Sequence, residues 1–438
     1  MPLAPRKEPQ LSRSTGQVRA SKGLTLTARI PGARRGDWVR VTRSDQSELD
    51  AEVIGFDDDD VTLMPLGDVR GVGPGDQVAW MGSGLSLRCS DELLGRVLDG
   101  MGRPLDDGPP IVGETCAISR SAPAPLSRPR VRRALPTGVR AIDALCTVVE
   151  GQRMGIFAPP GVGKTSLLAR LAERADAEVI VVSLVGERGR ELNEFLEDSL
   201  ALDARARSVV VCATSDAPAL ERVKCAHVAT AVAEHFRDQG KRVLLLVDSL
   251  TRMVRAAREV GLSAGEPPAR RGFPPSAFSE LAPLIERAGT APHGSITAFY
   301  TVLVEGNDLD EPVADEVRGL LDGHLILDRG LSERGHYPAI QVTRSLSRLM
   351  AQVVSPAHQA AAKRFRALLA HYESKRDLVE LGAVRAGADP LLDATLERLA
   401  DIEALLCQER EDHTELASSV ERLIRLDRLI HASTPKRP

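Results

Sequence analysis

Residues 155–168, GIFAPPGVGKTSLL, combine the end of a strand, a glycine-containing turn and the start of a helix around a Gly-Lys-Thr triplet. Backbone N–H groups in such a turn point at phosphate oxygens, and the helix N-terminus adds partial positive charge. This pattern predicts that the Lys164 ammonium reaches β- and γ-phosphates and that the Thr165 hydroxyl ligates Mg²⁺. The residues expected to hold the phosphates are Gly161, Val162, Gly163, Lys164, Thr165 and Ser166.

The loop departs from the pattern G-x-x-x-x-G-K-[ST] at its first position, where Ala158 stands and two prolines follow. Pro159 and Pro160 each lack a backbone N–H. The donors nearest the helix begin only at Gly161, however, and a Pro-Pro pair can preset the turn by fixing φ. We therefore expect a working phosphate site.

Hydrolysis needs more than a phosphate cradle: a group must position water, and positive charge must stabilise the transition state. Glu187 lies two residues beyond the end of the apolar run EVIVVSLV, and Asp248 directly follows the run RVLLLV. Ligands gather at the carboxyl ends of parallel strands. Taken alone, either acid is more often a helix cap or a surface ion pair. Their order behind the loop predicts instead that Glu187 polarises the attacking water and Asp248 holds Mg²⁺ through water.

The composition limits the class of protein. The chain has 438 residues, of which 43% are hydrophobic and 27% charged, which predicts two or three globular domains. A net charge of −4 and only 3% aromatic residues argue against a nucleic-acid partner. No apolar run approaches the about 20 residues that span a bilayer, and no secretory signal is apparent, so we expect a cytoplasmic protein.

The six cysteines are scattered along the chain. They form no C-x-x-C pair and have no histidine nearby at metal-binding spacing. This pattern predicts reduced, mostly buried thiols.

The composition and hydrophobic pattern of the chain predict four regions. Residues 1–22 are polar and basic, which predicts a disordered tail, and residues 23–90 show short alternating segments between turns, which predict a small β-barrel. Residues 91–355 alternate continuous apolar strands with helices, which predicts an α/β core with a parallel sheet, and a Pro/Arg-rich connector interrupts it near 119–136. Residues 356–438 carry apolar positions at three- and four-residue steps, which predicts a helical domain.

Four stretches carry a resemblance that spans roughly residues 24–429: ALPTGVRAIDALCTVVEGQRMGIFAPPGVGKTSLL, SLVGERGRELNEFLED, DSLTRMVRAAREVGLSAGEPPARRGFPPSAFSEL and GHLILDRGLSERGHYPAI. Together they resemble the rotary ATP synthase α/β-like family, and its type III secretion and flagellar export ATPases above all. That branch commonly has Ala at the position of Ala158. The resemblance implies a RecA-like P-loop ATPase core between a β-barrel and a helical domain, with ATP and Mg²⁺ as cofactors.

The resemblance also implies roles for single residues. Glu187 resembles the catalytic glutamate of the family's GER motif, and Arg188 lies beside it near the γ-phosphate. Asp248 resembles the Walker B acid. Arg348, in VTRSLSRLM, corresponds to an arginine finger that reaches across a subunit boundary. A chain with both the catalytic set and the finger can form every interface of a ring, which favours a homohexamer.

By resemblance, the leading hypothesis is an ATPase that energises type III secretion by unfolding substrates, releasing chaperones and promoting passage into the export gate. The implied partners are the stalk of the export apparatus, peripheral stator proteins and chaperone–effector complexes. The implied location is the cytoplasmic face of the bacterial inner membrane, where the basic tail adds about 1 kcal/mol of attraction per charge.

Three alternative functions compete with this hypothesis. A flagellar export ATPase is only weakly separated from the leading hypothesis. The stretches RGFPPSAFSEL and GERGRELNEFLED argue against an ATP synthase-type catalytic subunit. An RNA-translocating hexamer would need exposed aromatics in the barrel, where DWVRVTR and QVAWMG supply only Trp38 and Trp80.

Two positions depart from the family pattern. Gln341 stands where the family generally has Asp in PAID, and we expect this change to alter contacts near the subunit interface. Val384 stands in LGAVRAG where Tyr is common, in a stretch that we expect to line the adenine.

Overall fold

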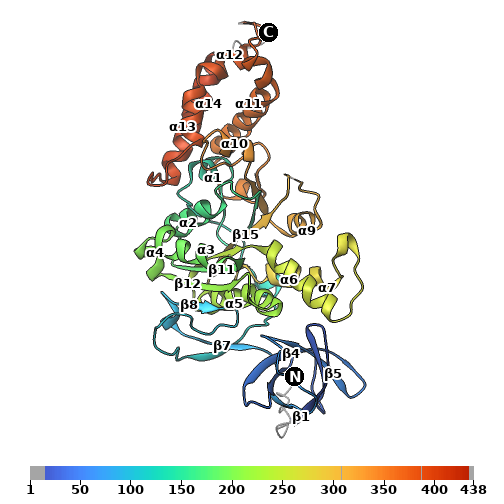
Figure 1. The fold of residues 1–438 in the computed structure, drawn as a ribbon. Helices are drawn as coiled ribbons and strands as arrows, with labels where there is room; N and C mark the ends of the chain where they lie inside the picture. The colour runs from blue at the N-terminus through green and yellow to red at the C-terminus, as the bar shows by residue number, and fades with distance from the viewer. Residues whose placement is uncertain (1–14, 307, 386, 434–438) are drawn as a thin grey trace.

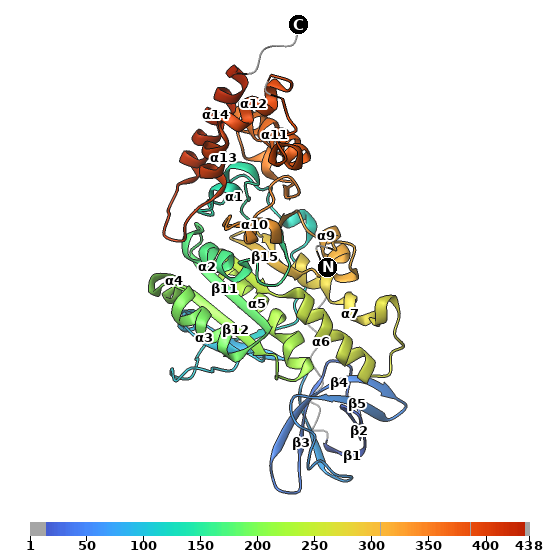
Figure 2. The ribbon, with the colours of Figure 1, turned by 45° about the horizontal axis from the view of Figure 1, so that its top comes forward.

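A computed structural model describes residues 15–306, 308–385 and 387–433. These residues form three parts in a row: a β-barrel at one end, a sheet-based core in the middle and a group of helices at the other end (Figures 1 and 2). Residues 1–14 of the predicted tail lie outside the described residues. The rest of that prediction is wrong, because Thr15–Lys22 form the first strand of the barrel.

The barrel closes in the order β1-β2-β5-β4-β3-β6, with all neighbours antiparallel. Its interior is apolar because alternate residues point inward, as the buried Val39 and Val41 of β3 do. The strands are β1 (Thr15–Lys22), β2 (Thr25–Arg29), β3 (Trp38–Thr42), β4 (Glu48–Asp57), β5 (Asp60–Pro65) and β6 (Gln77–Gly82). Beyond Gly82 the chain leaves the barrel, and β7 (Ser86–Cys89) pairs with β9 (Glu114–Ala117) in a small separate sheet.

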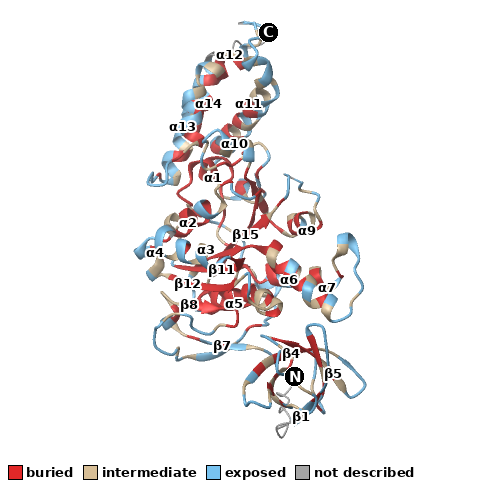
Figure 3. Ribbon diagram, in the orientation of Figure 1, coloured by how far each residue is buried: buried red, intermediate tan, exposed pale blue. Residues whose placement is uncertain are grey.

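The core is a sheet in the order β17-β16-β10-β15-β13-β11-β12-β8. Every residue of β11 is buried, as expected for a parallel strand covered on both faces (Figure 3). The parallel strands are β8 (Val97–Asp99), β10 (Arg153–Ala158), β11 (Val179–Glu187), β12 (Ser208–Thr214), β13 (Arg242–Asp248), β15 (Ser295–Leu303) and β16 (Gly323–Ile326). The short strands β14 (Gly289–Thr290) and β17 (Leu346–Ser347) pair antiparallel to β15 and β16.

Helices cover the two faces of the sheet. On one face, Ile180 and Val182 of β11 belong to an apolar cluster with Leu171 of α2 (Lys164–Arg174). On the other, Val181 belongs to a cluster with α5 (Ala219–Asp238) and α6 (Leu250–Ser263). The remaining helices of the core are α1 (Arg140–Leu145), α3 (Gly189–Glu194), α4 (Leu202–Ala206), α7 (Ser276–Ser279), α8 (Leu281–Glu286), α9 (Pro312–Leu320) and α10 (Arg329–Glu333). Short 3₁₀ turns span Asp91–Leu93, Pro125–Ser127, Arg270–Gly272 and Met350–Gln352, and a π turn spans Phe195–Ser199.

The C-terminal region is helical from residue 356. Its helices are α11 (Pro356–Glu380), α12 (Pro390–Glu397), α13 (Leu399–Leu406) and α14 (Leu416–Ser433). Ser355 caps the first of them by accepting a hydrogen bond from the His358 N–H at 3.2 Å, and proline follows at the position where its missing N–H costs nothing. Within the described residues, no helix has the length and apolarity required to cross a bilayer.

Candidate nucleotide-binding site

The phosphate-binding loop lies where β10 ends and α2 begins. Gly161 and Gly163 have φ of +80° and +88°, a left-handed conformation that favours glycine. The first N–H groups of α2 have no partner inside the helix, and Thr165 and Ser166 are exposed beside them. This end of the helix therefore presents the donors that the sequence predicts.

The two prolines leave this geometry intact. Ala158, directly before them, still pairs with Leu303 of β15, and its carbonyl accepts a hydrogen bond from the Val304 N–H at 3.1 Å. Pro159 is buried, whereas Pro160 and the following Gly161 are exposed. The prolines thus occupy the part of the turn that precedes the phosphate donors.

Both predicted acids lie beside Lys164. The Lys164 ammonium forms an ion pair with Oδ1 of Asp248 and lies 3.6 Å from Oε1 of Glu187. Oδ1 of Asp248 also accepts a hydrogen bond of 2.7 Å from the Thr301 hydroxyl of β15. These groups meet because β11, β13 and β15 end at the same edge of the sheet as β10, which leads into the loop.

Arg252, which the sequence reasoning missed, holds Glu187 in place. Its Nη1 lies 2.8 Å from Oε2 of Glu187, and the guanidinium also donates to the Gly186 carbonyl. Ser249 caps α6 by accepting a hydrogen bond from the Arg252 N–H at 3.3 Å. The signal was present in the sequence: an arginine in the first turn of the helix after Asp248 faces the same edge of the sheet.

The environment of Glu187 changes its acidity. Burial, a hydrogen bond shared with Glu191 and the charge of Asp248 raise the pKa of Glu187 to about 7, against the opposing effect of Lys164 and Arg252. The same hydrogen bond lowers the pKa of Glu191. A carboxylate with a pKa near neutrality is suited to accept a proton from water.

The two predicted arginines lie apart from this cluster. Arg188 is the residue directly before α3, and its side chain makes no capping hydrogen bond. That side chain is 72% exposed, with Nη1 at 3.7 Å from Oε1 of Glu191. Arg348 directly follows β17. In that strand, Ser347 pairs with Gly323 at the start of β16, and Gly323 also pairs with Met154 near the start of β10. Arg348 therefore lies at the end of the sheet opposite the phosphate loop. Its exposed side chain forms no hydrogen bond or ion pair with any other residue that the structure describes.

An aromatic ring lies beside the loop. A Cβ placed on Gly163 would be 3.5 Å from Cε1 of Tyr337, whose side chain is half-exposed. The Tyr337 carbonyl accepts a hydrogen bond of 2.8 Å from the Gln408 N–H, and Nη1 of Arg170 donates to the Gln408 carbonyl at 3.1 Å. Segment 407–412, which follows α13, thus lies next to the phosphate-loop helix. In the sequence, Tyr337 stands out only as part of the stretch GHLILDRGLSERGHYPAI.

The prediction that the stretch around Val384 lines the adenine is wrong. Val384 lies in the loop between α11 and α12, and both views place that loop at the far end of the helical region from α2 (Figures 1 and 2). Gln341 lines a cavity together with residues of α10, α11 and α13, and its Oε1 is buried and has no hydrogen-bond partner among the described residues.

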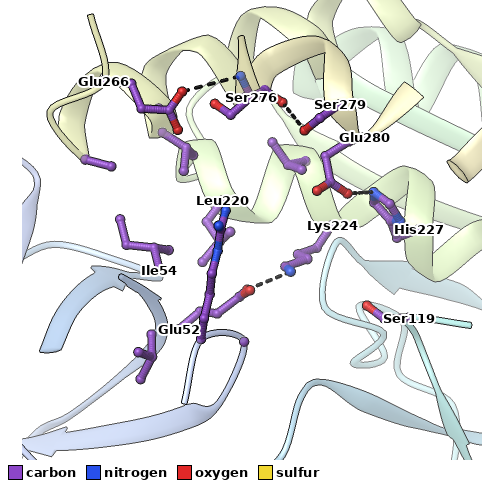
Figure 4. A pocket seen from close by; sticks show the side chains of 18 residues that line it. Glu52, Ile54, Ser119, Leu220, Lys224, His227, Glu266, Ser276, Ser279 and Glu280 are labelled. Atoms are coloured by element: carbon purple, nitrogen blue, oxygen red, sulfur yellow. Dashed lines mark hydrogen bonds and ion pairs between the residues drawn. The ribbon is translucent and has the colours of Figure 1, made fainter. Parts of the chain in front are cut away.

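A cavity of about 220 Å³ lies elsewhere, where the barrel meets α5, α6 and α7 (Figure 4). Across it, Lys224 of α5 pairs with Glu52 of the barrel at 2.6 Å, and Nε2 of His227 lies 3.5 Å from Glu280. No residue of the phosphate loop lines it. This cavity belongs to the joint between barrel and core and is separate from the candidate nucleotide site, which lies at the exposed first turn of α2.

Comparison with known proteins agrees with this geometry. Residues 138–347 match the nucleotide-binding domain of the ATP synthase alpha/beta family, and residues 29–82 match the beta-barrel domain of the same family. Residues 354–425 match the C-terminal domain of the type III secretion ATPase EscN.

Similar proteins cover nearly the whole chain. The type 3 secretion system ATPase of Pseudomonas syringae pv. tomato is 47% identical over 94% of each chain. The flagellum-specific ATP synthase of Salmonella typhimurium is 46% identical over 92% of this chain and 90% of its own. A solved structure of assembled EscN from enteropathogenic E. coli, in complex with its central stalk EscO, superposes with a TM-score of 0.87 at 43% identity, covering 94% of this chain and all of that one. The chain therefore belongs to the ATP synthase alpha/beta family, as an ATP-hydrolysing member of its type III secretion and flagellar branch.

Proposed function

We propose that this chain hydrolyses ATP at the surface above α2 in order to energise protein export by a type III secretion system. The observation that supports it most is the meeting of Lys164, Glu187 and Asp248 at one edge of the sheet, directly beside exposed phosphate donors. The C-terminal region favours the secretion branch, because the family model that it matches is that of a secretion ATPase.

Each residue of the cluster has a defined task in this proposal. Lys164 leaves Asp248 for the β- and γ-phosphates, and Glu187 accepts the proton of the attacking water while Arg252 holds its carboxylate in place. Arg188, with its exposed side chain, swings toward the γ-phosphate. The half-exposed ring of Tyr337 gives the adenine a face to stack on.

Thr165 and Asp248 are the proposed Mg²⁺ residues. A hydroxyl and a carboxylate are the hard oxygen donors that Mg²⁺ prefers, and Mg²⁺ usually keeps several waters in such sites. When bound, Mg²⁺ neutralises charge on the β- and γ-phosphates. Two observations support this assignment: Thr165 is exposed at the first turn of α2, and the Asp248 carboxylate accepts a hydrogen bond from Thr301.

The position of Arg348 supports a ring. The residue is exposed, distant from its own chain's phosphate loop and without an ion-pair partner among the described residues, as a finger for a neighbouring subunit would be. We propose a homohexamer at the cytoplasmic face of the inner membrane. It would contact a central stalk, peripheral stator proteins and chaperone–effector complexes.

The pKa of Glu187 leads to a testable pH dependence. Because only the ionised carboxylate accepts a proton, we expect kcat/KM for ATP hydrolysis to rise as the pH passes through about 7. The measurement is kcat/KM from about pH 5.5 to 9. ATP itself titrates in this range, so the residual activity of Glu187→Gln supplies the reference profile. If that variant shows the same inflection as the wild type, Glu187 is not the titrating group.

The biological role is tested in the bacterium that makes this chain. We expect chromosomal Lys164→Ala to stop export of secretion substrates while the cells still assemble flagella and swim, because the variant keeps its fold but loses the charge that binds phosphates. The control is Lys375→Ala, which removes a lysine from α11. Loss of motility with normal secretion would instead identify the chain as the flagellar export ATPase.

A further inference from the structure

Two cysteines and a histidine that are far apart in the sequence meet where the β7–β9 sheet contacts α5. Cys89 is the last residue of β7, Cys116 lies in β9, and His235 lies near the end of α5. Their ligand atoms, the two Sγ atoms and a ring nitrogen, all lie within 4.8 Å of one another. Neither the phosphate site nor the proposed export function uses these side chains.

The pairing of β7 and β9 explains the convergence. Cys116 lies opposite Leu87, and Glu114 lies opposite Cys89. Residues opposite each other share a face of a sheet, as do residues two apart on one strand. Both thiols and the Glu114 carboxylate therefore lie on the same face. That face packs on α5. There His235, which is only 6% exposed, lies beside the two thiols and the Glu114 carboxylate.

Glu114 supplies a fourth donor. Its Oε1 lies 3.0 Å from Nδ1 of His235 and 3.9 Å from Sγ of Cys116. Two thiolates, an imidazole and a carboxylate form a set that suits Zn²⁺ in tetrahedral geometry. Tetrahedral zinc–ligand bonds of about 2.0–2.3 Å place neighbouring ligand atoms about 3.3–3.8 Å apart. The two Sγ atoms and the ring nitrogen, which lie within 4.8 Å of one another, therefore need to close by at most about 1.3 Å.

The surroundings complete such a site. Nε2 of His235 lies 3.1 Å from the side-chain amide of Gln239. With that amide turned, its oxygen accepts the Nε2–H and leaves Nδ1 free to ligate, as metal-binding histidines require. Arg120, which pairs with Asp238 at 2.9 Å, lies close enough to interact electrostatically with both thiols and offsets their negative charge.

We propose that Cys89, Cys116, His235 and Glu114 bind a soft divalent cation of the Zn²⁺ class. The site is structural, because four protein ligands leave no open position for substrate. Bound metal would fasten the β7–β9 sheet, through which the chain passes from barrel to core, onto the end of α5.

The first test uses Co²⁺ as a probe on the full-length protein, reduced and stripped of metal. We expect one Co²⁺ per chain to give a thiolate-to-cobalt charge-transfer band and the strong visible bands of tetrahedral cobalt, and Zn²⁺ to displace it. The Cys116→Ser variant should lose the charge-transfer band or most of its intensity. Cys407→Ser, which removes another half-buried cysteine, should keep it, and Glu114→Gln should weaken binding at least about tenfold.

A second measurement needs no variant. In the wild type, Zn²⁺ should protect Cys89 and Cys116 from alkylation, read by mass spectrometry, while Cys407 reacts at an unchanged rate. The proposal is overturned if no thiolate band forms, if the band survives Cys116→Ser unchanged, or if Zn²⁺ leaves the alkylation of both thiols unaffected. A disulfide between Cys89 and Cys116 that persists under reducing conditions and prevents metal binding would also overturn it.

Discussion

Arg348→Ala is expected to lower ATP turnover by the assembled protein about 10³–10⁵-fold, the range that arginine fingers contribute in other phosphate-hydrolysing enzymes. The side chain is exposed and makes no ion pair with any described residue of its own chain, so its loss should leave the fold and the phosphate loop intact. The expected defect therefore lies in chemistry at the site of a neighbouring subunit.

Turnover per chain, measured against protein concentration, separates this effect from simple inactivation. Wild-type turnover should rise with concentration as rings form, and Arg348→Ala should stay low throughout. Arg344→Ala, an exposed arginine four residues earlier, is the matched control and should behave as the wild type. A rate that is independent of concentration and survives Arg348→Ala would contradict both the finger and the ring.

Mixing gives a sharper test of action between subunits. A ring containing both Arg348→Ala and Glu187→Gln chains has some interfaces with an intact glutamate from one chain and an intact arginine from the other. We expect such mixtures to regain activity that neither variant shows alone. Mixtures that stay inactive while the two variants demonstrably assemble together would argue that Arg348 acts within its own chain.

Glu187→Gln is expected to lower kcat about 10²–10⁴-fold while ATP binding is retained. Glutamine keeps the size of the side chain and a hydrogen-bond acceptor for Arg252, but it cannot take a proton from water. Nucleotide affinity should change little, because the phosphate donors and Lys164 are untouched. The measurement is kcat from steady-state kinetics, together with nucleotide affinity by calorimetry.

Stability and a matched variant distinguish this result from misfolding. Folding raises the pKa of Glu187 above that of the unfolded chain, so the stability this group contributes is present at acidic pH and lost as the pH rises through about 7. At about pH 8, Glu187→Gln should therefore unfold at a temperature no lower than the wild type. Glu194→Gln, on the exposed face of α3, should keep full activity. A Glu187→Gln enzyme with near-normal kcat would refute the assigned role.

The phosphate loop and its acids could be predicted from the sequence because the information is local. A glycine turn between a strand and a helix fixes the donors, and apolar runs that end in Glu187 or Asp248 bring both acids to one edge of a parallel sheet. Strand β1 was missed for the opposite reason. Val18 is its only buried residue, so it lacks the alternation that marks a strand.

Other errors concern residues that only tertiary structure brings together. Tyr337 lies beside the phosphate loop and is hydrogen-bonded to segment 407–412. No spacing in the sequence reveals this contact. For the same reason, the sequence wrongly suggested that Val384 lines the adenine. Helices α12 and α13 separate Val384 from segment 407–412, which lies beside the phosphate-loop helix. Cys89, Cys116 and His235 meet only because a two-stranded sheet packs on α5.

The strand order of the central sheet also sets when each part of the chain can fold during synthesis. The six barrel strands are consecutive and pair antiparallel, so the barrel can close as soon as residue 82 has left the ribosome. Strand β10 lies between β15 and β16, where Met154 pairs with Phe299 and Gly323. At typical rates of translation, roughly 10–35 s separate the synthesis of β10 from that of its second neighbour. Until β15 is made, this apolar strand has neither neighbour, and until β16 follows it has only one. The nascent core therefore needs protection from aggregation although the finished barrel does not.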